Sequence, residues 1–196
     1  MPHIALNSDE PGIRGLLRFR PETAVPLNQL AEVLLRGEST LSRGERELIG
    51  AYVSSLNRSR FCSSSHAACA AAQLPEGMAL VEQVRTDVDS APVSPKLRAL
   101  LEIAAAVQRG GGEVTGEHAD RARAAGATDV EIHDTVLIAA AFCMFNRYVD
   151  GLGTDAPEDA DSYAMAAERL IAVGYVADAN GTDRKASTAP GPPSAR

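Results

Sequence analysis

Residues 128–150, TDVEIHDTVLIAAAFCMFNRYVD, decide the fold class of this chain. Thr128 and Glu131 have the spacing of a capping box, in which each side chain binds a backbone N–H at the start of a helix. The residues that follow are apolar on nearly every side of a helix, so we expect this helix to lie in the centre of a domain or against a neighbouring subunit. Its longest apolar run, roughly residues 136–145, is about half of what crosses a bilayer, so no membrane span is expected.

Helical periodicity continues on both sides of this stretch. Ser42 and Glu45 form a second capping box, and Ser94 followed by Pro95 is typical of a helix start. No segment shows the alternation of a strand bounded by turns. We therefore predict an all-α fold of about seven or eight helices. The expected helices span about residues 27–35, 42–56, 60–73, 75–85, 95–110, 117–125, 128–150 and 156–173.

Composition divides the chain into three segments. Residues 1–25 are rich in Pro, Gly and Arg without sustained periodicity, so we expect an irregular arm. Residues 26–176 are expected to form the all-α domain. Residues 177–196 are polar and rich in Pro, Gly and Ser, which predicts disorder.

Composition also limits which binding partners and which cellular compartment we expect. The net charge is −7 without a basic stripe, which argues against nucleic acid. The first residues lack the apolar stretch of a signal peptide, and three irregularly spaced cysteines make no disulfide framework. We therefore expect a cytoplasmic protein with reduced thiols.

Reactive side chains gather in residues 57–69, NRSRFCSSSHAAC. Cys62, His66 and Cys69 stand at i, i+4 and i+7, so a helix places them on one face. Cys62 lies in the first turn, where free backbone N–H groups favour a thiolate. Glu47 on the preceding helix could carry protons for this site.

A disulfide between Cys62 and Cys69 is not expected. Seven helical residues place their Cα atoms roughly 10 Å apart, beyond the reach of a bridge. A redox partner for Cys62 would have to be Cys143, another subunit or a small thiol.

Structural roles explain the same residues. Buried cysteines often act as small apolar core residues, His66 could be an ordinary hydrogen-bonded histidine, and Ser59 could cap its helix. The trio of Cys, His and Cys offers only three ligands at a spacing that fits no zinc pattern. We therefore expect no metal, and nothing in the sequence indicates another cofactor.

Two stretches resemble a known family. They are LRGESTLSRGERELIGAYVSSLNRSRFCSSSHAACAAAQ at residues 35–73 and FCMFNRYVDGLG at residues 142–153. Together with PGIRGLLRFRP at residues 11–21, they resemble the carboxymuconolactone decarboxylase and alkylhydroperoxidase D superfamily, in particular its peroxidase-related branch. The resemblance covers about residues 11–175 and implies an oligomer, as a dimer, a trimer or a hexamer built from them.

The resemblance also implies roles for individual residues. In this family two cysteines form a redox pair, and a glutamate and a histidine relay protons. Cys62 matches the cysteine that attacks peroxide, and Glu47 and His66 match the relay. The other cysteine falls on Ser59, and Phe61 replaces a histidine that some members carry. A serine cannot resolve a sulfenic acid, so catalysis through an internal Cys-x-x-Cys disulfide is excluded.

Three functions remain open. The first is a peroxidase-related oxidoreductase in which Cys62 is the nucleophile, Glu47 and His66 move protons, and an external thiol is the reductant. The second is a cofactor-free lyase, decarboxylase or isomerase that acts on a small organic acid, with His66 or Glu47 as the base. The third is a catalytically inactive assembly or binding subunit. The expected partners are a small-molecule substrate, either a hydroperoxide or an organic acid, and further copies of the chain; the roles of Cys69 and Cys143 stay open.

Overall fold

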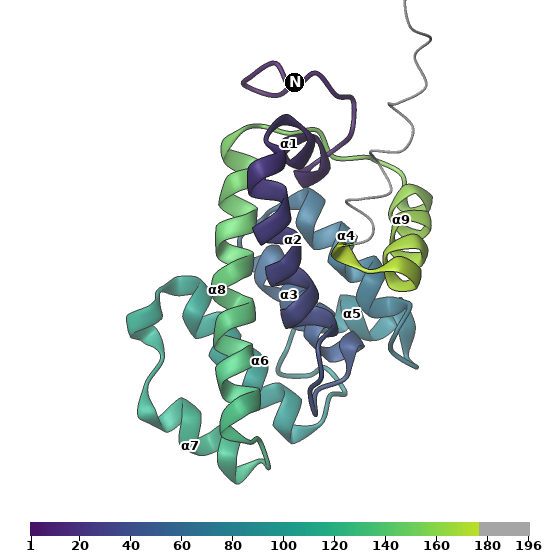
Figure 1. The fold of residues 1–196 in the computed structure, drawn as a ribbon. Helices are drawn as coiled ribbons and strands as arrows, with labels where there is room; N and C mark the ends of the chain where they lie inside the picture. The colour runs from purple at the N-terminus through teal and green to yellow at the C-terminus, as the bar shows by residue number, and fades with distance from the viewer. Residues whose placement is uncertain (177–196) are drawn as a thin grey trace, which may run out of the picture.

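The computed structural model describes residues 1–176, which form α-helices, one short 3₁₀ turn and no strand (Figure 1). The all-α fold class is confirmed, with nine α-helices in this part of the chain against the expected seven or eight. The helices are α1 (Ile13–Phe19), α2 (Pro21–Arg36), α3 (Arg43–Leu56), α4 (Arg60–Ala71), α5 (Gly77–Thr86), α6 (Pro95–Arg109), α7 (Gly116–Ala124), α8 (Asp129–Gly151) and α9 (Ala160–Val173).

Helix α8 runs along most of the molecule and packs against α3 and α6 (Figure 1). Its buried face includes Ile138, Phe142 and Val149. The Phe142 ring packs directly on Gly50 of α3, and a Cβ added at Gly50 would lie 2.4 Å from that ring. A glycine is needed there because any side chain would push the two helices apart. The opposite side of α8 is exposed, so the helix is buried on one face rather than all round.

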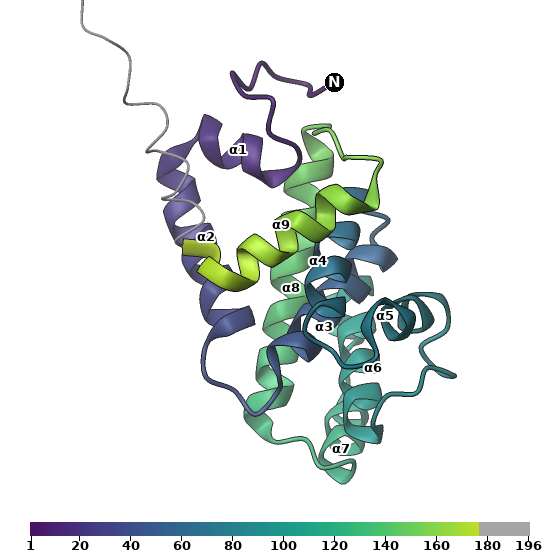
Figure 2. The same cartoon turned by 90° about the vertical axis from the view of Figure 1, so that its right-hand side faces the viewer.

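The short link between α3 and α4 places these two helices side by side. Asn57 ends α3, Arg58 adopts a left-handed conformation with φ 59°, and Ser59 precedes α4. Helix α9 then lies across α4, as Figure 2 shows. Ala68 and Cys69 of α4 pack against Tyr163 and Ala167 of α9. The candidate site residues on α3 and α4 therefore lie between neighbouring helices.

The expectation of an irregular arm over residues 1–25 is wrong for its second half. Residues 13–19 form α1, and α2 begins at Pro21. The short helix α1 is stabilised by tertiary packing, because Leu16 is fully buried against Leu6, Cys62 and Val149. The helix start expected at residue 156 is too early by several residues, because Asp159 caps α9, which begins at Ala160. The expected disorder at 177–196 lies outside the described residues.

Helix starts agree closely with the capping signals. The boxes at Ser42 and Thr128 form with both of their hydrogen bonds, and the Ser94 side chain caps α6. None of the helices within residues 1–176 combines the length and the apolar character that a membrane span requires.

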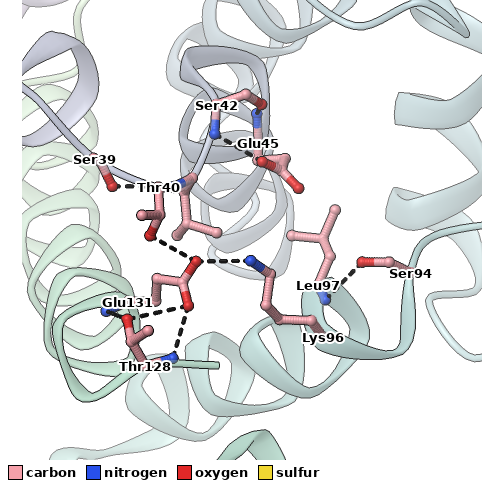
Figure 3. Close-up of polar contacts among 10 residues, drawn as sticks. Ser39, Thr40, Ser42, Glu45, Ser94, Lys96, Leu97, Thr128 and Glu131 are labelled. Carbon is pink, nitrogen blue, oxygen red and sulfur yellow. Dashed lines mark hydrogen bonds and ion pairs between the residues drawn. The ribbon is translucent and has the colours of Figure 1, made fainter. Parts of the chain in front are cut away.

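Glu131 extends its capping box into a buried cluster that joins three elements (Figure 3). Its carboxylate accepts hydrogen bonds from Thr128 N at 2.7 Å, Thr40 Oγ1 at 2.8 Å and Lys96 Nζ at 2.7 Å. Burial alone would raise the pKa of Glu131, but the Lys96, Thr128 and Thr40 donors outweigh it and lower the pKa to about 2. This carboxylate links the start of α8 to α6 and to the segment before α3.

Candidate functional site

Glu47 of α3 and His66 of α4 lie in direct contact. The Glu47 side chain is buried, with 3% of its surface exposed, and its Oε2 lies 2.6 Å from His66 Nδ1. The contact follows from the tight link between α3 and α4, which turns the two helices to face each other. The structure therefore brings together two of the three residues expected in the site.

Tyr175 is a third member of this cluster, and it follows the end of α9. Its hydroxyl donates a hydrogen bond of 2.8 Å to Glu47 Oε1. Burial and then the negative charge of Glu47 raise the pKa of Tyr175 well above its usual value. The phenol therefore keeps its proton and acts as a donor. When Nδ1 of His66 carries the ring hydrogen, each carboxylate oxygen of Glu47 accepts one hydrogen bond.

Aromatic rings hold the imidazole of His66. The Phe142 ring meets it edge-on with centroids 4.5 Å apart, and the Tyr175 ring lies nearly parallel at 6.5 Å. Nδ1 contacts Glu47, whereas Nε2 makes no hydrogen bond with any residue in 1–176. The ring is fixed through Nδ1, so Nε2 is the nitrogen that can meet another molecule.

His66 lines a cavity of about 510 Å³ between α1, α2, α4 and α9. Its wall is formed largely by apolar and aromatic side chains, namely Ile13, Leu17, Phe61, Tyr163, Leu170 and Tyr175. Among residues 1–176, the charged residues at the wall are Arg14, Arg18, Arg169 and Glu10, and the Glu10 carboxylate pairs with both Arg14 and Arg18. Guanidinium groups are donors suited to bind a carboxylate.

Asn28 of α2 adds an unsatisfied donor to the same wall. Its Nδ2 atom is enclosed and has no hydrogen-bond partner among the described residues. A buried polar atom without a partner is costly, and a bound ligand with an acceptor oxygen would satisfy it.

Cys62, the expected nucleophile, lies in another environment. It is 4% exposed, packs among Leu6, Leu16 and Val149, and is not among the described residues that line the cavity. Burial raises the pKa of its thiol, hydrogen bonding from Ser59 and Asn146 lowers it, and the charge of Asp150 raises it; the net effect is a raised pKa. These surroundings disfavour a thiolate, in contrast to the expectation from its position in the first turn of α4.

Ser59, which the sequence resemblance led us to expect at the place of the family's first cysteine, is fully buried. It stands at the N-cap of α4, but its side chain makes no capping bond, which corrects the expected capping role. Its hydroxyl instead donates to Asp150 Oδ1 at 3.0 Å. Ser59 therefore connects the start of α4 to the end of α8.

The other two cysteines lie in separate places. Cys69 lines the cavity, but burial and then the negative charge of Glu47 raise the pKa of its thiol far above the usual range. The sulfur of Cys143 accepts a long hydrogen bond of 3.5 Å from Asn57 Nδ2. All three cysteines are free. No group of three or more His, Cys, Asp or Glu side chains within residues 1–176 is arranged to hold a metal ion.

Comparisons with known proteins agree with this fold. Residues 75–153 match the carboxymuconolactone decarboxylase family. A solved structure of an alkylhydroperoxidase AhpD core, an uncharacterised peroxidase-related protein from Ralstonia eutropha JMP134, aligns with a TM-score of 0.71 at 24% identity, over 79% of this chain and 80% of that chain. An uncharacterised peroxidase-related protein from Silicibacter sp. TM1040 aligns with a TM-score of 0.71 at 27% identity, over 79% and 78%. No curated protein matches the chain.

These similarities define the class of protein. The chain has the alkylhydroperoxidase D-like helical fold, and the resemblance expected from its motifs is confirmed. The family match begins at residue 75, after Glu47, Cys62 and His66, so it does not include the candidate site. Tyr175 was not expected in that site, because a tyrosine after a helix-ending glycine carries no recognisable motif.

Proposed function

We propose that this chain is an enzyme that transfers protons on a small organic anion, with His66 as the general acid and base. One observation carries this proposal, namely the row of hydrogen bonds from Tyr175 through Glu47 to His66, which ends at the cavity. It corresponds to the cofactor-free lyase, decarboxylase or isomerase among the three functions left open by the sequence.

The arrangement suits proton transfer at Nε2. A carboxylate that accepts a hydrogen bond from Nδ1 fixes the ring orientation and leaves Nε2 as the free acceptor. When Nε2 takes a proton from the substrate, the imidazolium is stabilised by the Glu47 carboxylate 2.6 Å away. The same nitrogen then returns the proton to another atom of the substrate, so no external oxidant or reductant is consumed.

The cavity wall indicates the chemical class of the substrate. Its apolar lining favours a hydrocarbon or aromatic body, and guanidinium groups at the wall are donors suited to a carboxylate. The unpaired Nδ2 of Asn28 would donate to an oxygen of the same molecule. A small organic acid of moderate hydrophobicity satisfies all three features.

The proposal is tested by solvent exchange. Small carboxylic acids with an exchangeable C–H are incubated with the protein in D₂O, and deuterium incorporation is followed by proton NMR. We expect exchange with at least one acid, and we expect His66→Gln to slow it by about 10²–10⁴-fold, the usual contribution of a general base. Cys62→Ala should retain exchange, and His133→Gln, at an exposed histidine of α8, is the matched control.

Two results would contradict the proposal. One is that no acid in the panel exchanges its protons above the rate of a protein-free solution. The other is that His66→Gln keeps full exchange, whether or not Cys62→Ala loses it.

A single-cysteine peroxidase is the second candidate, since the two aligned structures are of peroxidase-related proteins and hydrogen bonding with Ser59 and Asn146 acts to lower the pKa of the Cys62 thiol against the effect of burial. In that reaction the thiolate attacks the O–O bond, an alcohol or water leaves, and an external dithiol reduces the sulfenic acid to thiol and water. The test is peroxide consumption with dithiothreitol, together with mass spectrometry after substoichiometric peroxide. Oxidation of Cys62 before Cys69 and Cys143 supports this candidate, and no consumption above the blank excludes it.

A further inference from the structure

Tyr175 is held at its backbone as well as at its hydroxyl. Tyr175 N donates a hydrogen bond of 2.7 Å to Glu32 Oε2 on α2. The residue is therefore fixed between two carboxylates, Glu32 at the backbone and Glu47 at the hydroxyl. Both contacts are made beyond α9, which ends at Val173.

Arg36, one turn after Glu32 on α2, binds the end of α9. Its NH1 group donates to the carbonyls of Ile171 at 3.0 Å and Leu170 at 3.4 Å, and its Nε lies 3.1 Å from Glu32 Oε1. A cation at the C-terminus of a helix satisfies carbonyls that have no partner within the helix and interacts favourably with the helix dipole. Figure 2 shows the end of α9 beside α2, where these contacts form.

Gly174 permits the close approach of these groups. It has φ 83°, a left-handed conformation that favours glycine, and its N–H donates to Leu170 O at 2.8 Å. An added Cβ would lie 2.7 Å from Glu32 Oε2 and 3.2 Å from Arg36 Nε. A side chain at this position would displace Glu32 from the backbone of Tyr175.

We infer that Glu32 and Arg36 are positioning residues, which hold Gly174 and Tyr175 so that the Tyr175 hydroxyl fixes Glu47 and, through it, the ring of His66. Their importance for catalysis rests on the proposed function, but the positioning itself does not. Helix α2 contributes to the cavity wall through Asn28 and, by this route, to the orientation of the proton-transfer group.

Nitrogen NMR of the histidine rings tests this inference without any substrate. The chain has four histidines, and the His66 signals are those that disappear in His66→Gln. Tyr175→Phe, which removes only the hydroxyl, defines the shift expected when Glu47 loses this donor. We expect Glu32→Ala and Gly174→Ala to shift the His66 nitrogens in the same direction. Glu32→Gln keeps an acceptor oxygen for Tyr175 N, so it should shift them less than Glu32→Ala.

A control on the same helix separates positioning from general stability. Glu22 lies in the first turn of α2 and is largely exposed, so Glu22→Ala should leave the His66 signals unchanged. The inference is overturned if Glu32→Ala lowers the melting temperature while the His66 signals stay at their wild-type positions, or if Glu32→Gln and Glu32→Ala shift them equally. If His66→Gln keeps full proton exchange, the proposed function fails, whereas the nitrogen shifts still decide the positioning.

Discussion

Burial explains why the cysteine that the sequence marks most clearly is a poor candidate nucleophile here. Cys62 lies in the first turn of α4, where backbone N–H groups favour a thiolate, yet Leu6, Leu16 and Val149 enclose its side chain. An apolar environment disfavours charge on sulfur, and the nearby Asp150 acts in the same direction. His66, by contrast, has a carboxylate partner in Glu47 at Nδ1, and its ring also lines the cavity.

Thiol labelling against pH measures this difference. In a Cys69→Ser/Cys143→Ser variant, Cys62 is the remaining thiol. Because burial raises its pKa, we expect iodoacetamide to label Cys62 more slowly than free cysteine at neutral pH, with a midpoint above the roughly 8.5 of an exposed thiol. A midpoint below that of free cysteine would contradict this expectation and favour the peroxidase candidate.

Two capping boxes of the same sequence type have different structural importance. Among residues 1–176, the hydrogen bonds of the Glu45 side chain stay within its own helix start, with Ser42 N donating to Glu45 Oε2 at 2.7 Å. The Glu131 box is buried and also binds Lys96 and Thr40, which come from other parts of the chain. Sequence spacing identifies both helix starts but does not distinguish a local cap from a tertiary junction.

Glu131→Gln should therefore destabilise the fold more than Glu45→Gln. We expect a loss of about 1–3 kcal/mol in the free energy of unfolding for Glu131→Gln, because the buried network loses its negative charge and one of its two acceptor oxygens. The loss for Glu45→Gln should be smaller, because a glutamine can make the same capping-box bond. Urea unfolding followed by circular dichroism measures both. Equal losses in the two variants would show that the tertiary contacts of Glu131 contribute little.

The same carboxylate predicts an acid dependence of stability. The folded pKa of Glu131 is lowered from 4.5 to about 2, so its contribution is fully present above pH 4.5 and disappears as the pH falls toward 2. The difference in unfolding free energy between wild type and Glu131→Gln should therefore shrink across this interval. A difference that stays constant from pH 6 to pH 3 would contradict the lowered pKa.

Exposed apolar side chains on α8 are relevant to the expected association of copies of the chain. Helix α8 exposes Val130, Leu137 and Met144 at seven-residue intervals, with exposed fractions of 64%, 38% and 43%. This spacing places the three side chains along one side of the helix, beside the face that packs on α3 and α6. Such a stripe is consistent with the oligomer that the family resemblance implies.

Sedimentation of the full chain tests that expectation. We expect a mass above that of the 20.6 kDa monomer, and a shift toward the monomer for Leu137→Glu, which places a charge in the middle of the stripe. Arg121→Glu, at an exposed position of α7, is the control for a surface charge change. A wild-type monomer at micromolar concentration would contradict the expectation.

Local signals were sufficient for the helical class and most helix starts. Capping boxes at Ser42 and Thr128, the cap at Ser94 and the glycine after Val173 each act within one turn of the chain. The resemblance in residues 35–73 likewise predicted that Glu47 and His66 belong to one site. The two side chains are in contact because a short link joins the adjacent helices that carry them.

Long-range packing accounts for the elements and contacts of the site that the local signals missed. Helix α1 is short and proline-flanked, and it forms because Leu16 is buried against residues far along the chain. Tyr175 joins the site because α9 crosses α4 and ends beside Glu32 and Arg36, more than a hundred residues earlier. Ser59 binds Asp150 of α8 rather than capping its own helix. Spacing along one chain segment specifies which groups share a helix face, but burial and partners depend on which distant helix covers that face.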